Sequence, residues 1–75
     1  MLTENQENLI YALADAGIDE DLSCAIVSAM EDEQMPILTE YIIGELEEGE
    51  KVIESKVVEA MLIINGDLEV EEDDE

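Results

Sequence analysis

Carboxylates are the side chains that this sequence offers for chemistry. It contains 23 aspartate and glutamate residues, two lysines, no arginine and no histidine, for a net charge of −21 at pH 7. Acid–base catalysis needs two carboxyl groups whose pKa values are separated by different surroundings. In so acidic a chain no particular pair stands out, and no glycine-rich phosphate loop accompanies them. The sequence therefore predicts a protein that is not an enzyme, with no catalytic residues and no cofactor.

Cys24 is the one cysteine, so it cannot form a disulfide within the chain. The sequence has no histidine that could activate the thiol as a nucleophile or help to complete a zinc site. Its neighbours Ala25 and Ile26 are apolar, which is typical of a small buried residue. We therefore expect Cys24 to lie in the core.

Oxygen ligands for calcium are plentiful, but their spacing does not fit a calcium loop. Such a loop alternates oxygen ligands and has a glycine at its sixth position. In the alternation that begins at Asn65, the sixth position is Val70, and the acidic triplet 19–21 has no glycine at the required place. We predict no specific metal site.

The charge also limits the partners of the protein. Proteins bind nucleic acid mainly through cations that displace counterions from phosphates, and Lys51 and Lys56 cannot offset 23 carboxylates. The same field repels anionic membranes and attracts basic proteins. The sequence thus excludes direct nucleic-acid binding and membrane binding, and favours a basic protein partner.

A first helix is predicted over residues 4–16. Thr3 and Gln6 have the spacing of a capping box, and Gly17 suits a left-handed helix end. Between them apolar residues recur at helical spacing, at Leu9, Ile10, Leu13 and Ala16.

A second helix is predicted over residues 20–31, with Asp19 or Asp21 as its N-cap. Its apolar stripe consists of Leu22, Ala25, Ile26, Ala29 and Met30. The acids at 31–33 would lie at the negative end of the helix dipole, so the helix should stop there.

A third helix is predicted over residues 36–48, because Pro36 fits a first helical turn and Gly49 fits a helix end. Its apolar residues are Ile37, Leu38, Tyr41, Ile42 and Leu46. Gly44 weakens the helix, or else allows a neighbouring helix to approach closely.

A fourth helix is predicted over residues 51–64, with a main stripe of Ile53, Val57, Ala60, Met61 and Ile64. Further apolar residues lie off this stripe, so the helix is either central in the fold or in contact with another chain. The pair Asn65-Gly66 leaves a hairpin over 61–70 as the alternative, because Leu68 and Val70 alternate with acids. We favour the helix, with Asn65-Gly66 as its end.

These elements predict an all-α domain over residues 1–68, a small bundle of four short helices. Residues 69–75 carry six acids and are expected to be a disordered tail. The N-terminus lacks the basic region of a secretory signal, and the longest apolar run, 60–64, is too short to cross a bilayer. We expect a cytoplasmic protein.

The function that we expect is binding to a basic partner protein. Acidic residues would steer the encounter, and apolar side chains would form the centre of the contact. The expected anchors are Val58 and Leu62, off the main stripe of the fourth helix, with Met35 and Tyr41 in support. The fourth helix could also form a homodimer. The alternative is that these residues simply complete the core.

A second hypothesis is that the protein mimics nucleic acid and inhibits a DNA- or RNA-binding protein, since its carboxylates could imitate the field of a duplex. Mimicry requires acids in one or two rows. The acids expected to contribute are Glu31, Asp32, Glu33, Glu40, Glu47, Glu48, Glu54 and Glu59. The alternative is that these acids form an ordinary charged surface that keeps the protein soluble.

Overall fold

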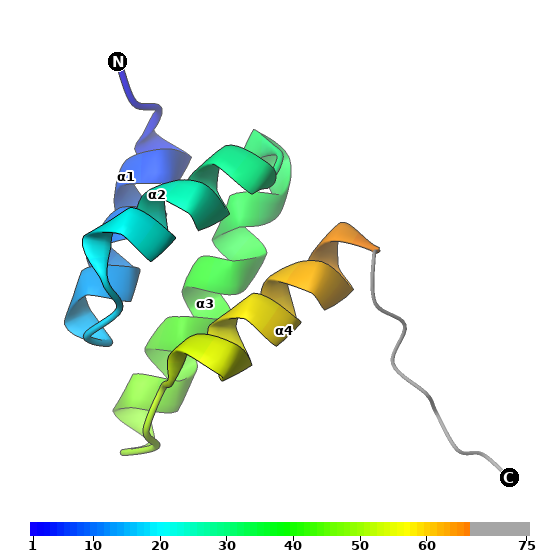
Figure 1. The fold of residues 1–75 in the computed structure, drawn as a ribbon. Helices are drawn as coiled ribbons and strands as arrows, with labels where there is room; N and C mark the ends of the chain where they lie inside the picture. The colour runs from blue at the N-terminus through cyan, green and yellow to red at the C-terminus, as the bar shows by residue number, and fades with distance from the viewer. Residues whose placement is uncertain (67–75) are drawn as a thin grey trace, which may run out of the picture.

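The computed structural model describes residues 1–66, which form four α-helices and no strand. The prediction of an all-α fold of four short helices is confirmed, while the predicted tail at 69–75 lies outside the described residues. The helices are α1 (Glu4–Asp15), α2 (Glu20–Ala29), α3 (Met35–Glu47) and α4 (Glu54–Asn65), with a short 3₁₀ helix, η1 (Asp32–Gln34), directly before α3 (Figure 1).

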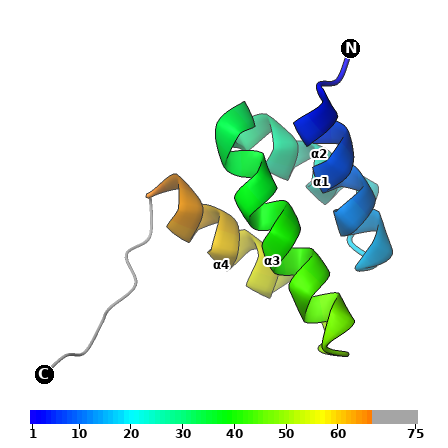
Figure 2. The same ribbon diagram turned by 180° about the vertical axis from the view of Figure 1, so that it is seen from behind.

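Helix α3 is the central element of the bundle. Helix α1 packs along it and against α2, and α4 crosses α3 obliquely, as the two opposite views show (Figures 1 and 2). The core between the helices consists of aliphatic side chains and methionines. Its largest fully buried side chains are Leu9, Leu13, Ile26, Met35, Leu38, Ile42 and Val57.

Both ends of α1 form as the sequence predicts. The Thr3 hydroxyl accepts a hydrogen bond from the Gln6 backbone N–H at 3.2 Å, and the Gln6 side chain accepts one from the Thr3 N–H at 2.8 Å. At the other end Gly17 has φ +82°, and the Ile18 N–H donates to the Leu13 carbonyl at 3.0 Å. This Schellman arrangement turns the chain and directs Ile18 into the core.

Helix α2 is capped by Asp19, whose carboxylate accepts from the Asp21 N–H at 3.0 Å. The helix ends at Ala29, two residues before the predicted end, in keeping with the unfavourable position of acids 31–33 at a helix C-terminus. Ser23 is buried, and its hydroxyl donates to the Asp19 carbonyl at 3.0 Å. The one polar side chain among the buried residues of α2 therefore has a hydrogen-bond partner.

Helix α3 has Pro36 in its first turn, as predicted. The alternative that Gly44 allows a close helix approach is wrong for residues 1–66, because a Cβ at this position would meet no atom of these residues within 4 Å. The glycine therefore costs helix propensity without a packing benefit.

Helix α4 starts at Glu54 rather than at 51. Val52 is buried and the backbone of Ile53 is extended, so the chain reaches the core before the helix begins. The helix continues through Asn65 and ends at Gly66, with φ +86°. Residues 61–65 are thus helical, and the hairpin alternative is wrong for them. Within residues 1–66, no helix has the length and apolarity needed to cross a membrane.

Candidate interaction surface

The surface is strongly anionic. Every aspartate and glutamate from residue 1 to residue 66 is exposed, except the half-buried Glu45. Glu45 is also the acid that pairs with a lysine, since Lys56 Nζ lies 3.0 Å from its Oε1. The hydrogen bond to Glu45, followed by charge attraction, raises the pKa of Lys56 above its usual value. Because the charged Lys56 is paired with Glu45, Lys51 is the lysine left to balance the remaining carboxylates of residues 1–66.

Asp32 differs from the other acids that we assigned to nucleic-acid mimicry. Its carboxylate accepts from the Thr3 hydroxyl at 2.6 Å and from Asn5 Nδ2 at 3.0 Å. Asn5 Nδ2 also lies 3.2 Å from the Asp32 carbonyl oxygen. Asp32 thus holds the start of α1 against η1. Asp32 is exposed, and so are the other acids of that set: Glu31, Glu33, Glu40, Glu47, Glu48, Glu54 and Glu59.

The spacing of these acids along the helices is sparse. Glu40 and Glu47 lie on one face of α3, about 10 Å apart along its axis. Glu54 and Glu59 of α4 point about 140° apart around the helix. Duplex DNA presents one charge per roughly 1.7 Å of axis. The helices therefore carry far fewer carboxylates per unit length than a duplex carries phosphates.

The expected apolar anchors fall into two groups. Met35 is 1% exposed and belongs to the core, so it is not accessible to a partner in this fold. Val58, Leu62 and Tyr41 are half-buried. Val58 and Leu62 are four residues apart, which places them on one side of α4, and each keeps part of its side chain accessible.

Several large apolar side chains are more exposed than these anchors. Tyr11 of α1 is 65% exposed and Ile53, before α4, is 51% exposed. Ile37, Ile43 and Ile63 are also exposed. Sequence reasoning missed Tyr11 as a surface residue, although it lies off the stripe of Leu9 and Leu13 and could have been found from that offset.

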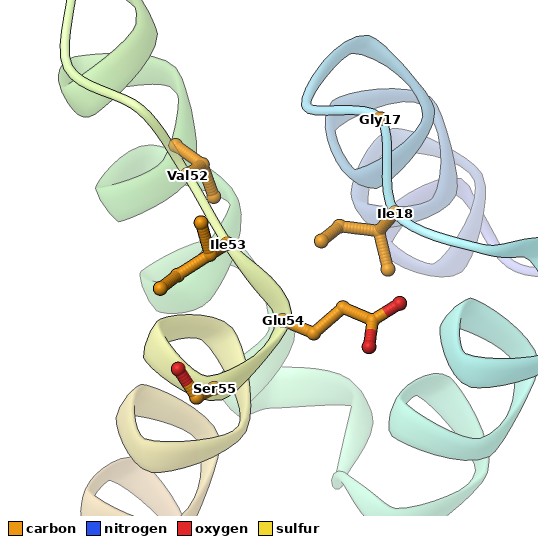
Figure 3. Close-up of a pocket in the computed structure, with 6 residues that line it drawn as sticks. All are labelled: Gly17, Ile18, Val52, Ile53, Glu54 and Ser55. Atoms are coloured by element: carbon orange, nitrogen blue, oxygen red, sulfur yellow. The ribbon is translucent and has the colours of Figure 1, made fainter.

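A shallow hollow of about 540 Å³ lies between the loop that follows α1 and the start of α4. The side chains of Ile18 and Glu54 extend into the space between these two loops (Figure 3). Its remaining lining comes from Gly17, Val52, Ile53 and Ser55. One carboxylate beside aliphatic walls suits contact with a cationic side chain that has an apolar stem.

A second hollow, of about 320 Å³, lies between α1 and α2 and is more enclosed. Its walls are mainly apolar, and among residues 1–66 Glu20 is the one charged residue that lines it. Ile18 borders this hollow as well as the first. The lining consists of Ile10, Tyr11, Ala14, Ile18, Glu20 and Ser23.

The expectation that Cys24 is buried is wrong, because the thiol is exposed. The side of α2 that faces the core carries Ser23, Ile26 and Val27, so Cys24 falls on the outward side. In the part of the chain that the structure describes, no three Cys, Asp or Glu side chains group closely enough to hold a metal ion.

No protein-family model, no curated protein and no solved structure matches this chain.

Proposed function

We propose that the protein is a non-enzymatic, cytoplasmic interaction module that binds a basic partner protein. The observation that carries this proposal is the combination of two surface properties. Within residues 1–66 every carboxylate except the half-buried Glu45 is exposed, and Glu45–Lys56 is the one salt bridge there. Large apolar side chains are exposed among them. A surface of this kind attracts cations over a distance and offers apolar contacts once they arrive.

The proposed contact residues on α4 are Val58 and Leu62, with Tyr41 of α3 in support. All three are half-buried, so an approaching side chain can cover their exposed part without unfolding the bundle. Burial of such apolar surface contributes about 25 cal/mol per Å². Charge attraction would mainly increase the association rate and would weaken as salt is added.

A second copy of the chain is a less favourable partner than a basic protein. Each copy has a net charge of −21, so two copies repel each other until their apolar surfaces meet. A homodimer through α4 is therefore the outcome that we expect only at high salt, where the repulsion is screened.

Nucleic-acid mimicry ranks below partner binding because of the sparse spacing of the exposed acids and the structural role of Asp32. A mimic would displace a basic DNA-binding protein from duplex DNA. Displacement that persists in the Leu62→Ser variant would favour mimicry over the apolar contact.

The proposal is tested by affinity capture from the native host at low and high salt, followed by direct binding of the captured protein. We expect a partner with a high isoelectric point, with weaker binding at high salt. Leu62→Ser should weaken binding by about tenfold or more, as loss of a buried apolar anchor does.

Ile63→Ser is the matched control, because Ile63 is exposed on another side of α4. Equal loss of binding in both variants, or a partner that is not basic, would contradict the proposal.

A further inference from the structure

The hollow between α1 and α2 has an apolar floor that is fixed by the backbone. Ile18 is only 7% exposed and borders the hollow from the loop between the helices. The Ile18 N–H is held by the Leu13 carbonyl at 3.0 Å, and Asp19 caps α2 directly after it. A ligand would therefore meet a surface that is already ordered, which lowers the entropic cost of binding.

Tyr11 stands at the edge of this hollow and is flanked by acids. Glu7 and Asp15 lie four residues before and after it, so all three side chains share one side of α1. Glu7 and Asp15 are both exposed, and Glu20 lines the hollow from α2. No lysine lines the hollow. The hollow thus combines an apolar interior, an accessible aromatic face and a carboxylate on each side.

We propose that this hollow receives one aliphatic side chain from an amphipathic, basic helix of the partner protein. Lysine or arginine side chains on the same helix would contact the Tyr11 ring through cation–π attraction and pair with Glu7, Asp15 and Glu20. An amphipathic helix against a hydrophobic groove is a common mode of peptide recognition. This inference rests on the proposed function, since it places the basic partner on α1 and α2 rather than on α4 alone.

Charge decides between this occupant and the others that an apolar hollow could accept. A second copy of the chain, an acidic peptide and an anionic lipid surface would all bring negative charge toward Glu7, Asp15 and Glu20. The volume of about 320 Å³ lies at the lower limit for small-molecule sites. A single aliphatic anchor with cations around it fits both the size and the charge of the hollow.

The test is a titration of the ¹⁵N-labelled protein, followed by NMR. The probe is an amphipathic leucine–lysine peptide of about 15 residues, a length at which helices begin to form. Oligolysine of equal charge is the control peptide. We expect the largest amide shifts at Tyr11, Ala14 and Ser23 with the amphipathic peptide, and weak, dispersed shifts with oligolysine.

The variants Tyr11→Ser and Glu20→Gln should each weaken binding of the amphipathic peptide by roughly five- to tenfold. Ile37→Ser and Glu50→Gln are the matched controls. They remove an exposed apolar side chain from α3 and an exposed carboxylate from the segment after it, and should change affinity by less than about twofold.

The outcomes separate this inference from the proposed function. Shifts that centre on Val58 and Leu62, with Tyr11→Ser binding as the wild type does, would overturn the assignment to the hollow and leave basic-partner binding in place. Equal affinity for the amphipathic peptide and oligolysine, without localised shifts, would overturn both. Absence of binding at low salt would also overturn both.

Discussion

The hydroxyl of Thr3 donates a hydrogen bond of 2.6 Å to the carboxylate of Asp32, across 29 positions of the chain. The same hydroxyl accepts the Gln6 N–H that caps α1. A single threonine therefore starts the first helix and connects it to the segment before α3. In a small domain with a modest core, one such connection is a sizeable part of the total stability.

Asp32→Ala should lower the free energy of unfolding by about 1 kcal/mol relative to Glu33→Ala. Both variants remove one negative charge from neighbouring exposed positions, so relief of repulsion is the same in each. Only Asp32 accepts from Thr3 and Asn5. Urea denaturation of the two variants measures the difference, and equal stabilities would show that these hydrogen bonds contribute nothing net.

Gly44→Ala should stabilise the protein by about 0.5–1 kcal/mol, because the position is helical and an added Cβ meets no atom of the described part of the chain within 4 Å. Gly49→Ala is the contrasting variant. Gly49 has φ +80°, so alanine there should destabilise by about 1–2 kcal/mol. Thermal melts of both variants test the pair, and a lower melting temperature for Gly44→Ala would indicate a contact that this fold does not contain.

Salt should stabilise the fold. The exposed carboxylates repel one another, and raising the NaCl concentration from about 0.01 M to about 1 M shortens the Debye length from about 30 Å to about 3 Å. The melting temperature measured by circular dichroism should therefore rise with NaCl. A melting temperature that is independent of salt would mean that the repulsion is not a significant term in stability.

Lys56 should make stability depend on pH in the alkaline range. Its pKa is raised above 10.5 in the folded protein, mainly by the hydrogen bond to Glu45. The folded state then holds the proton more tightly than the unfolded state. The stabilisation is fully present below 10.5 and is lost as the pH rises through the higher folded value.

Denaturant melts at about pH 9 and about pH 11.5 measure this loss. Lys56→Gln should show a smaller decline than the wild type between these values, while Lys51→Gln should behave as the wild type does. A decline of equal size in Lys56→Gln would assign the effect to other groups.

Several helix ends were predictable because their signals are local. The Thr3–Gln6 pair, the Asp19 cap and the left-handed glycines at 17 and 66 act within a few residues. The start of α4 was misplaced because Val52 turns into the core from extended backbone. Whether this segment is extended or helical depends on contacts with residues distant in the sequence, and the periodic pattern of apolar residues gives no information about such contacts.

The candidate surface was less predictable than the fold. Met35 was expected at the surface and Cys24 in the core, and the structure has the reverse. The first hollow depends on how the α1–α2 and α3–α4 loops meet, and the second depends on how α1 packs against α2. The sequence alone gives neither arrangement. The acidity of the surface, by contrast, follows from composition, because almost any fold of this chain must leave most carboxylates in water.

The exposed carboxylates have a consequence for the lifetime of the protein in a cell. Their repulsion raises the free energy of the folded state when the protein is unbound. A cationic protein that covers them would reduce this repulsion, and its binding would stabilise the folded state by mass action. A molecule that is not bound to such a protein unfolds more often, and proteases degrade the unfolded molecules. The abundance of this protein would then follow the supply of whatever covers it.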